Sequence, residues 1–192
     1  MAKVFEELSS SVSEVVSNVA PSVVGVGAGG SGVVVGPGLV ATNAHNLRGE
    51  EVVVTFADGR RVSAATTAAD HEGDLALLSV DTEGAQPLEW SGRPPRLGEA
   101  VIALAHPGGR GLRVGVGFVS AMDAAFRGPG GRRITGAVEH TAPLIRGSSG
   151  GPVLDGEGRL LGINTHREGD GFYLALLADD ELRGRIDALS RG

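Results

Sequence analysis

Short runs of β-branched and aliphatic residues follow one another from residue 22 to about residue 177, and each run ends at Gly, Pro or Asp-Gly. Runs of this length between tight turns are typical of antiparallel β-strands. Glycine supplies 32 of the 192 residues, without the three-residue period of collagen. The hydrophobic content of 41% is enough for a folded core. The pattern therefore predicts an all-β protein.

The strands fall into two groups separated by a segment rich in Pro and Gly that contains the only tryptophan, Trp90. We expect the first group near 22–27, 32–36, 38–41, 51–56, 60–66 and 74–80, and the second near 100–105, 112–119, 133–138, 152–154, 159–165 and 172–177. Two groups of six strands predict two six-stranded antiparallel β-barrels packed together. The predicted units are an N-terminal helical segment (1–21), a first barrel (22–85), a linker (86–98), a second barrel (99–178) and a C-terminal helix (179–192).

Both ends of the chain have helical patterns. Apolar residues recur at helical spacing from Val4 to Val19, and Pro21 ends this pattern. The sequence Ser11-x-x-Glu14 predicts the capped start of a second helical segment. Acidic residues at 179–181 followed by arginines favour a helix at the C-terminus.

Composition excludes several classes of function. Cysteine is absent, so disulfides, cysteine zinc sites and thiol nucleophiles are excluded. Lys3 is the only lysine, so a P-loop, a Schiff base or a Ser-Lys dyad would lack its central residue. A net charge of −6 disfavours nucleic acid and anionic membranes as partners, and no apolar run is long enough to span a membrane. The N-terminus does not resemble a signal peptide, so we expect a cytoplasmic protein if the chain is complete and an extracytoplasmic one if a signal was removed.

The segment from Arg146 to Leu154, Arg-Gly-Ser-Ser-Gly-Gly-Pro-Val-Leu, carries the strongest chemical signal. A serine enclosed by glycines can occupy a tight turn whose backbone N–H groups converge, which is the geometry of an oxyanion hole. The alternative is a flexible Gly/Ser loop, but the residues from Pro152 onward predict a strand that would anchor it.

A nucleophilic serine needs a base and an acid that orients the base. His45 follows a predicted strand pair, and Asp74 stands directly before an apolar strand. Taken singly, a histidine in a loop is more often a surface residue than a catalytic one, and an aspartate before a strand more often ends a turn. The order His45, Asp74, Ser149 instead places two candidates on the first barrel and one on the second. We therefore expect an active site between the barrels.

These motifs resemble the trypsin-like serine proteases, and among them the bacterial HtrA/Deg group. The matching segments run from Gly32 to Leu47, from Ala57 to Leu78, from Ala103 to Pro107 and from Gly147 to Thr165, and the resemblance extends over about residues 12–189. It implies a chymotrypsin/trypsin-like double barrel, polypeptide substrates, no cofactor and no metal. The resemblance also leads us to expect a homotrimer assembled through the N-terminal segment.

The resemblance assigns a role to each matching residue. Ser149 would be the nucleophile, His45 the general base and acid, and Asp74 the residue that orients His45. The backbone amides of Gly147 and Ser149 would bind the oxyanion. The substrate would contact Pro143 and Leu144 on one wall and Asn164, Thr165 and Arg167 on the other, with its backbone paired to the strand containing Asn164 and Thr165. With no acidic residue between Thr141 and Pro152, this pocket should prefer an aliphatic residue before the scissile bond, and we expect Arg167 to lie solvated at its rim.

The chain departs from the group's pattern at several points. Ser148 stands where Asn or Asp is usual, Asn46 where Val is usual, and Thr141 where an aspartate is usual. The PDZ domains typical of the group do not follow the closing helix, so we expect the protease domain only.

Three other functions compete with a protease. The Gly27–Gly32 run satisfies G-x-G-x-x-G, but a strand pattern follows it where a dinucleotide site would need a helix. His71, His106, His140 and His166 show no H-x-x-x-H spacing, so surface histidines are a better account than a metal site. A protease fold that only binds peptides remains an alternative, which the presence of all three triad residues disfavours.

Overall fold

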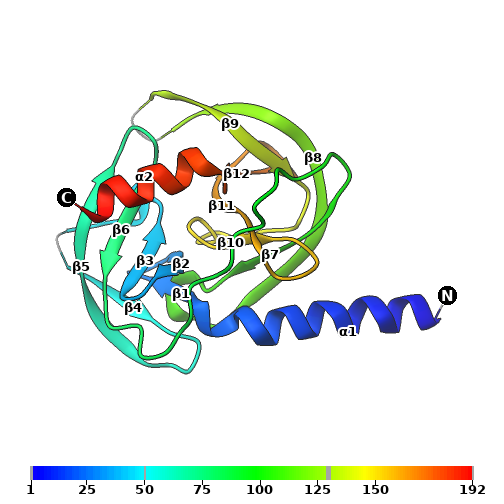
Figure 1. The fold of residues 1–192 in the computed structure, drawn as a ribbon, viewed down its shortest axis with the longest axis horizontal. Coiled ribbons are helices and arrows are strands. Elements are labelled where there is room, and N and C mark those ends of the chain that lie inside the picture. The colour runs from blue at the N-terminus through cyan, green and yellow to red at the C-terminus, as the bar shows by residue number, and fades with distance from the viewer. Residues whose placement is uncertain (1, 50, 129–130, 192) are drawn as a thin grey trace.

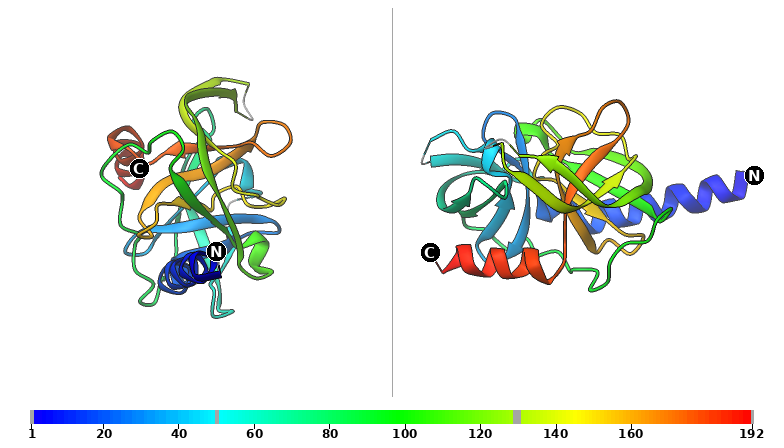
Figure 2. Two further views of the ribbon diagram at one scale, coloured as in Figure 1. Left: turned by 90° about the vertical axis from the view of Figure 1, so that its right-hand side faces the viewer. Right: turned by 90° about the horizontal axis from the view of Figure 1, so that it is seen from above.

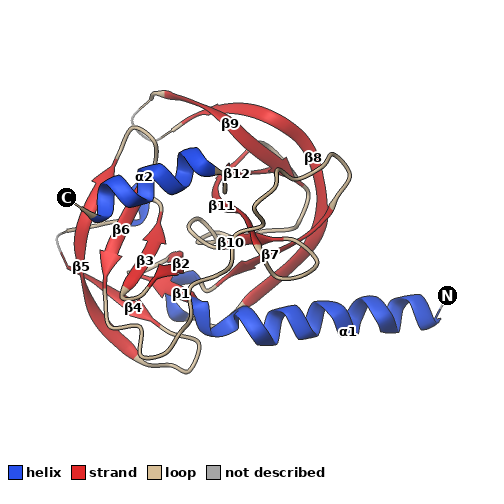
Figure 3. Cartoon of the chain, viewed as in Figure 1, coloured by secondary structure: helices blue, strands red, loops and turns tan. Residues whose placement is uncertain are grey.

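The structure is a computed structural model that describes residues 2–49, 51–128 and 131–191. Its strands form two closed barrels of six strands each, with a helix at either end of the chain (Figures 1 and 3). The expected all-β double barrel is therefore confirmed. The boundaries expected for the separate units stay a prediction, and their outermost residues, 1 and 192, lie outside the described part.

Each barrel is made of antiparallel strands in the same spatial order. The first contains β1 (Val23–Val26), β2 (Gly30–Gly36), β3 (Leu39–Thr42), β4 (Glu51–Thr55), β5 (Arg61–Asp70) and β6 (Leu75–Ser79), in the order β1-β2-β3-β6-β5-β4. The second contains β7 (Ala100–Ala105), β8 (Arg113–Arg127), β9 (Arg133–His140), β10 (Pro152–Leu154), β11 (Leu160–Arg167) and β12 (Tyr173–Leu177), in the order β10-β11-β12-β9-β8-β7. The pairs β1–β4 and β10–β7 close the barrels.

Several strands are buried on both faces, which explains why their sequences do not alternate between apolar and polar residues. In β6, Leu78 packs inside the first barrel, whereas its neighbour Leu77 packs in the cluster between the barrels. Ile163 and Leu174 of the second barrel join that same cluster. Because successive side chains of a strand point to opposite faces, one aliphatic run supplies both the barrel interior and the barrel interface. The site between the barrels thus rests on a continuous core.

Two strands of the second barrel are longer than expected. β8 was predicted to end at residue 119 but continues to Arg127, and β9 continues to His140. The pairing of β8 with β9 shifts register three times, and Asp123 adopts a left-handed φ of 54°. Bulges of this kind interrupt the alternating pattern by which a strand is found in a sequence.

The N-terminal helix α1 (Ala2–Val19) packs Val15 and Val19 into the core, while its first turns project beyond the barrels (Figures 1 and 2). The expected second helical start at Ser11 is wrong, because α1 is continuous. The Ser11 hydroxyl instead donates to the carbonyl of Glu7 at 2.9 Å, a bond that serine can form inside a helix. No helix among the described residues is both long and apolar enough to cross a membrane.

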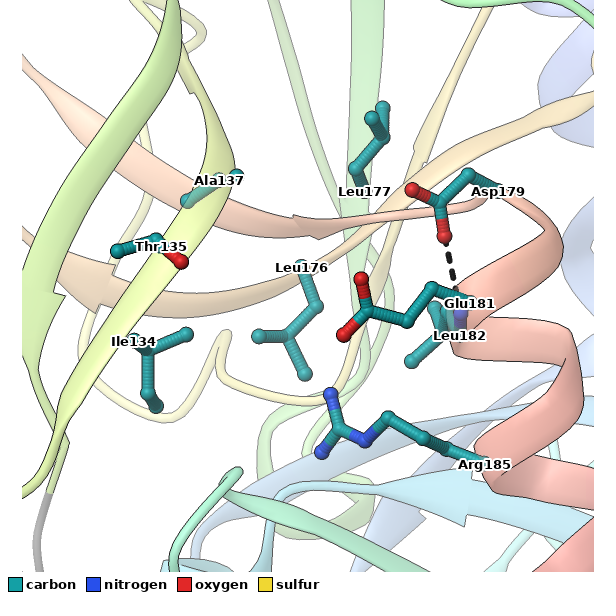
Figure 4. Close-up of a pocket in the computed structure, with 10 residues that line it drawn as sticks. Ile134, Thr135, Ala137, Leu176, Leu177, Asp179, Glu181, Leu182 and Arg185 are labelled. Atoms are coloured by element: carbon teal, nitrogen blue, oxygen red, sulfur yellow. Dashed lines mark hydrogen bonds between the residues drawn. The ribbon is translucent and has the colours of Figure 1, made fainter.

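The C-terminal helix α2 (Asp180–Ser190) begins after Asp179, whose carboxylate accepts from the Leu182 amide at 2.9 Å (Figure 4). Leu182 and Ile186 anchor the helix in the core between the barrels. A hollow of about 50 Å³ lies between α2, β9 and β12, and Arg185 extends beside it (Figure 4). It contains none of the residues expected in the active site.

Candidate active site

The histidine and the aspartate come from neighbouring strands of the first barrel. His45 lies in a short 3-10 helix (Ala44–Asn46) directly after β3, and Asp74 directly precedes β6, which pairs with β3. The imidazole Nδ1 of His45 lies 2.9 Å from both carboxylate oxygens of Asp74. The backbone amide of His45 also donates to Asp74 Oδ1 at 3.2 Å. The carboxylate is therefore fixed against both the ring and the backbone of the histidine.

The carboxylate of Asp74 has a further donor from the second barrel. Asp74 is only 1% exposed, and the hydroxyl of Thr165 donates to its Oδ2 at 2.6 Å. Such donors offset the cost of burying a carboxylate away from water. The backbone of Asp74 adopts a left-handed φ of 53°, and the side-chain amide of Asn43 donates to the Asp74 carbonyl at 2.9 Å. The sequence motifs predict Thr165 only beside the substrate, and they give no sign of its bond to Asp74.

The two serines of the glycine-rich loop have different surroundings. Ser148 is 3% exposed, and its hydroxyl accepts from the amide of Ile145 at 3.2 Å. Ser149 lines an open cleft together with His45. The glycines on either side, Gly147 and Gly150, have φ near +90° (92° and 90°), and a Cβ on either would meet a backbone oxygen of the first barrel at 2.0 Å. Only glycine fits these two positions, because the loop presses against the first barrel.

The hydroxyl of Ser149 donates to the carbonyl of Thr165 at 3.1 Å. Among the described residues, no hydrogen bond joins this hydroxyl to His45, although both side chains border the same cleft. Thr165 thus contacts Asp74 through its hydroxyl and Ser149 through its carbonyl. The structure brings His45, Asp74 and Ser149 to one site, with Thr165 between the aspartate and the serine.

Three successive backbone carbonyls of the serine loop, at residues 147–149, each accept a hydrogen bond. The Ser31 hydroxyl donates to Gly147 O at 2.8 Å, and the Gly151 amide donates to Ser148 O at 3.0 Å. The Ser149 carbonyl accepts from the Ser31 amide at 3.0 Å and from Asn46 Nδ2 at 2.9 Å. Within the described part of the chain, the amides of Gly147 and Ser149 donate to no protein acceptor. Both amides belong to residues that line the cleft.

Ser31 was not predicted as a site residue, and Asn46 was expected only as a departure from the usual residue. One signal for Asn46 was present, since an amide stands where an aliphatic residue is usual. The partners of the Ser31 hydroxyl lie 75 and 116 residues away along the chain, so no local pattern reports these bonds.

Of the expected specificity residues, Asn164, Thr165 and Arg167 lie at the end of β11, and Pro143 and Leu144 lie in the loop after β9. Asn164 is buried, its Nδ2 donates to Gly151 O at 3.1 Å, and its Oδ1 lies 2.9 Å from His140 Nε2. Pro143 is exposed and Leu144 is half-buried. Arg167 turns toward the following loop, where its guanidinium contacts Asp170 and donates from Nε to Gly169 O at 2.8 Å.

His140 is fully buried and stacks on Tyr173 with ring centroids 5.9 Å apart. Burial lowers the pKa of His140, and the opposing influence of its bond to Asn164 is smaller. The ring is therefore neutral near pH 7 and can donate from Nε2 to the Asn164 oxygen. This bond fixes the amide that holds the carbonyl of Gly151. Among the described residues, no three His, Asp or Glu side chains gather as a metal site would need.

Known proteins match this chain over most of its length. The family described as "Trypsin-like peptidase domain" matches residues 30–163. Serine protease HTRA4 of Mus musculus is 32% identical over 187 residues, which cover 88% of this chain and 39% of the relative. Serine endoprotease DegS of Salmonella typhimurium is 31% identical over 140 residues, covering 71% of this chain and 39% of the relative. The chain thus spans about two fifths of the length of these relatives.

Solved structures match the fold. The serine endoprotease from Yersinia pestis superposes with a TM-score of 0.80 at 27% identity, covering 94% of this chain and 66% of that one. Rv3671c from M. tuberculosis H37Rv, in an inactive form, superposes with a TM-score of 0.81 at 27% identity, covering 92% of this chain and 90% of that one.

Proposed function

Because this chain belongs to the trypsin-like peptidase family, we propose that it is a serine endopeptidase that cleaves unfolded polypeptides through His45, Asp74 and Ser149. One observation carries the proposal. His45, held by Asp74, and Ser149, beside two amides without protein acceptors, border a single cleft. A base, a nucleophile and an oxyanion site around one opening are the parts that acyl transfer requires.

Each part has a separate role in the proposed reaction. Ser149 Oγ attacks the peptide carbonyl while His45 takes its proton, and His45 then protonates the leaving amine as the acyl-enzyme forms. Water repeats the sequence to release the acid. Asp74 holds the imidazole so that Nε2 faces the serine. The amides of Gly147 and Ser149 bind the oxyanion, and loss of one such donor costs about 100- to 1000-fold in turnover.

Before reacting, the Ser149 hydroxyl must leave the Thr165 carbonyl to which it donates. A substrate that pairs with β11 supplies a backbone N–H to the Thr165 carbonyl and takes the place of the hydroxyl. The serine side chain then rotates to another staggered position and donates to His45. Binding of the peptide backbone therefore prepares the nucleophile.

We further propose that an aliphatic residue precedes the scissile bond. Pro143 stands six positions before Ser149, and no acidic residue lies between Thr141 and Pro152. A basic substrate side chain would be desolvated there without a partner. Arg167 contacts Asp170 in the following loop, so it offers no charge to an acidic side chain. Val, Ala and Leu fit such a pocket.

A homotrimer formed through the N-terminal segment is a separate part of the proposal. Val4, Phe5 and Leu8 of α1 are exposed where the helix projects from the barrels (Figure 2). Apolar side chains exposed together on one helix favour association. Sedimentation of the protein beside its Phe5→Glu variant tests this, with a trimer expected only without the substitution.

Digestion of β-casein, an unfolded protein, tests the main proposal. The protein should cleave casein after aliphatic residues, and Ser149→Ala should not. Ser148→Ala should retain cleavage, because Ser148 is buried and does not line the cleft. Cleavage by Ser149→Ala at the original rate would contradict the proposal. A folded protein that binds peptides but never cleaves them would support the inactive peptide-binding module instead.

A further inference from the structure

The cleft that contains His45 and Ser149 extends over the first barrel and encloses about 790 Å³. It is lined by the turn between β1 and β2 (residues 27–30), by the first half of β4 and by Gly147 of the serine loop. None of its lining residues belongs to β11. Ser149 thus borders this cleft and also contacts β11, the strand proposed to pair with substrate, through Thr165.

The side chains around this cleft carry a strong positive charge. Its lining contains four arginines, Arg48, Arg61, Arg110 and Arg146, and a single described carboxylate, Glu51. The chain as a whole has a net charge of −6, so the cleft opposes the charge of the rest of the molecule. A cleft lined by charges of one sign attracts and orients ligands of the opposite charge.

These four arginines have no carboxylate partner among the described residues. Some arginines elsewhere are paired, as Arg93 is with Glu99 and Arg159 with Asp155, whereas others, such as Arg133, also have no carboxylate partner among the described residues. Arg110 instead donates to the carbonyl of Ala28 at 2.9 Å, which holds it beside the β1–β2 turn. The guanidinium groups at the cleft are therefore available to an added carboxylate, which arginine can bind through two parallel hydrogen bonds.

We propose that this cleft binds the acidic part of a polypeptide substrate, namely Asp and Glu residues in the first few positions after the scissile bond. The assignment of direction rests on the proposed function. If the residues before the scissile bond pair with β11, the residues after it must leave Ser149 on the other side, toward the arginines. Substrate choice then combines an aliphatic residue before the bond with carboxylates after it.

Binding to the Ser149→Ala protein tests the cleft without cleavage. The probes are two fluorescent peptides with the same residues up to the scissile Val, followed by Asp-Glu-Asp-Glu in one and by Asn-Gln-Asn-Gln in the other. The acidic peptide should bind about 10-fold or more tightly, and the difference should shrink as salt is raised, because exposed charges are screened. The additional substitutions Arg48→Glu and Arg61→Glu together should abolish the difference.

Arg133→Glu is the matched control, since Arg133 is also an exposed arginine but lies on β9 outside the cleft. It should preserve the preference of the Ser149→Ala protein. Equal affinity for the two peptides, or equal losses in the cleft variant and the control, would overturn the proposal. Tighter binding of a single-stranded oligonucleotide than of the acidic peptide would overturn it as well, because the cleft would then be a nucleic-acid site.

A second substrate separates this proposal from the proposed function. A peptide ending in Val-p-nitroanilide has no residue after the scissile bond, so its hydrolysis by the unsubstituted protein reports the triad alone. Hydrolysis of the anilide without a preference between the two peptides would refute only the acidic cleft. A preference for the acidic peptide without anilide hydrolysis would refute the peptidase activity, while the cleft would stand as an acidic-peptide site.

Discussion

The amide of Ser31, in β2 of the first barrel, donates to the carbonyl of Ser149, in the second barrel, at 3.0 Å. The hydroxyl of the same fully buried serine donates to Gly147 O and accepts from the amide of His106 at 2.9 Å. With the Gly151 amide on Ser148 O, three successive carbonyls of the loop are fixed. Since a peptide unit is planar, fixing the Ser148 carbonyl also fixes the direction of the Ser149 amide. The first barrel thus fixes the peptide units on either side of the Ser149 amide, one of the proposed oxyanion donors.

Replacing Ser31 with Ala should reduce both stability and turnover. The change leaves the Gly147 carbonyl and the His106 amide without their partner, which costs about 1–3 kcal/mol of unfolding free energy. The freed loop should lower kcat about 10-fold with little change in KM, since the donors act mainly in the transition state. Urea unfolding and steady-state kinetics measure the two effects. An unchanged kcat in a destabilised Ser31→Ala protein would show that this serine only supports the fold.

Thr165→Val should separate the effect of the Thr165 hydroxyl from the effect of its packing. Valine keeps the shape but removes the 2.6 Å bond to Asp74, and bonds to charged groups contribute about 1.5–3 kcal/mol. We expect kcat to fall by about 10- to 100-fold, which is the same free energy expressed as a rate. Thr165→Ser keeps a hydroxyl and should restore most of the activity. Equal losses in the serine and valine variants would attribute the effect to packing.

Arg185 of α2 forms hydrogen bonds with the turn that leads into Asp74. Its Nη2 donates to Asp70 Oδ2 and to Gly73 O, both at 2.9 Å. Burial raises the pKa of Asp70, but the Gly73 amide and the Arg185 charge together outweigh burial, so the pKa lies below its ordinary value of 3.8. A carboxyl with a lowered pKa stabilises the fold above about pH 4 and loses this contribution as the pH falls through its folded-state value.

Arg185→Gln should therefore be less stable than the parent at pH 7, and the gap should narrow below pH 4. Because Asp70 is partly exposed, solvent screens the pair and the gap should be modest. Thermal unfolding across this pH range measures it. A gap that stays constant with pH would assign the loss to packing of α2 and not to the carboxyl of Asp70.

The buried His140 should make stability depend on pH between 7 and 5. Its pKa is lowered by burial, so the folded protein keeps it neutral while the unfolded chain takes up a proton below its reference value of 6.5. Stability should fall as the pH drops below 6.5, by at most about 1.4 kcal/mol per pH unit for one such group. Burial also lowers the pKa of His106, which adds a loss in the same direction.

Urea unfolding at pH 7 and pH 5 should show a smaller loss for His140→Gln than for the parent. The matched control is His71→Gln, because His71 is exposed, and it should keep the parental pH dependence. If both variants lost stability as steeply as the parent, His140 would not be the group that titrates.

The sequence predicted the barrels because their strands carry a local signal. The Leu75–Leu78 run marks β6, and glycine turns mark most strand ends. Local patterns failed where bulges break the alternation, as in β8, and where a serine bonds inside a helix, as Ser11 does.

The site was only partly visible in the sequence for a similar reason. His45, Asp74 and Ser149 stand in recognisable motifs, and their catalytic roles stay a prediction. The contributions of Ser31 and Thr165 depend on hydrogen bonds between the barrels, which span 116 and 91 residues of sequence. Such bonds follow from how the two barrels pack, and no periodicity or short motif reports that packing.

Labelling with a fluorophosphonate, followed by mass mapping of the modified residue, tests whether Ser149 is an activated nucleophile. The reagent modifies a serine only where a base activates it and an oxyanion site stabilises the adduct. We expect one adduct, on Ser149, which is absent in Ser149→Ala and strongly reduced in His45→Ala. A folded protein that forms no adduct, or one that is modified at Ser148 or any other serine, would contradict it.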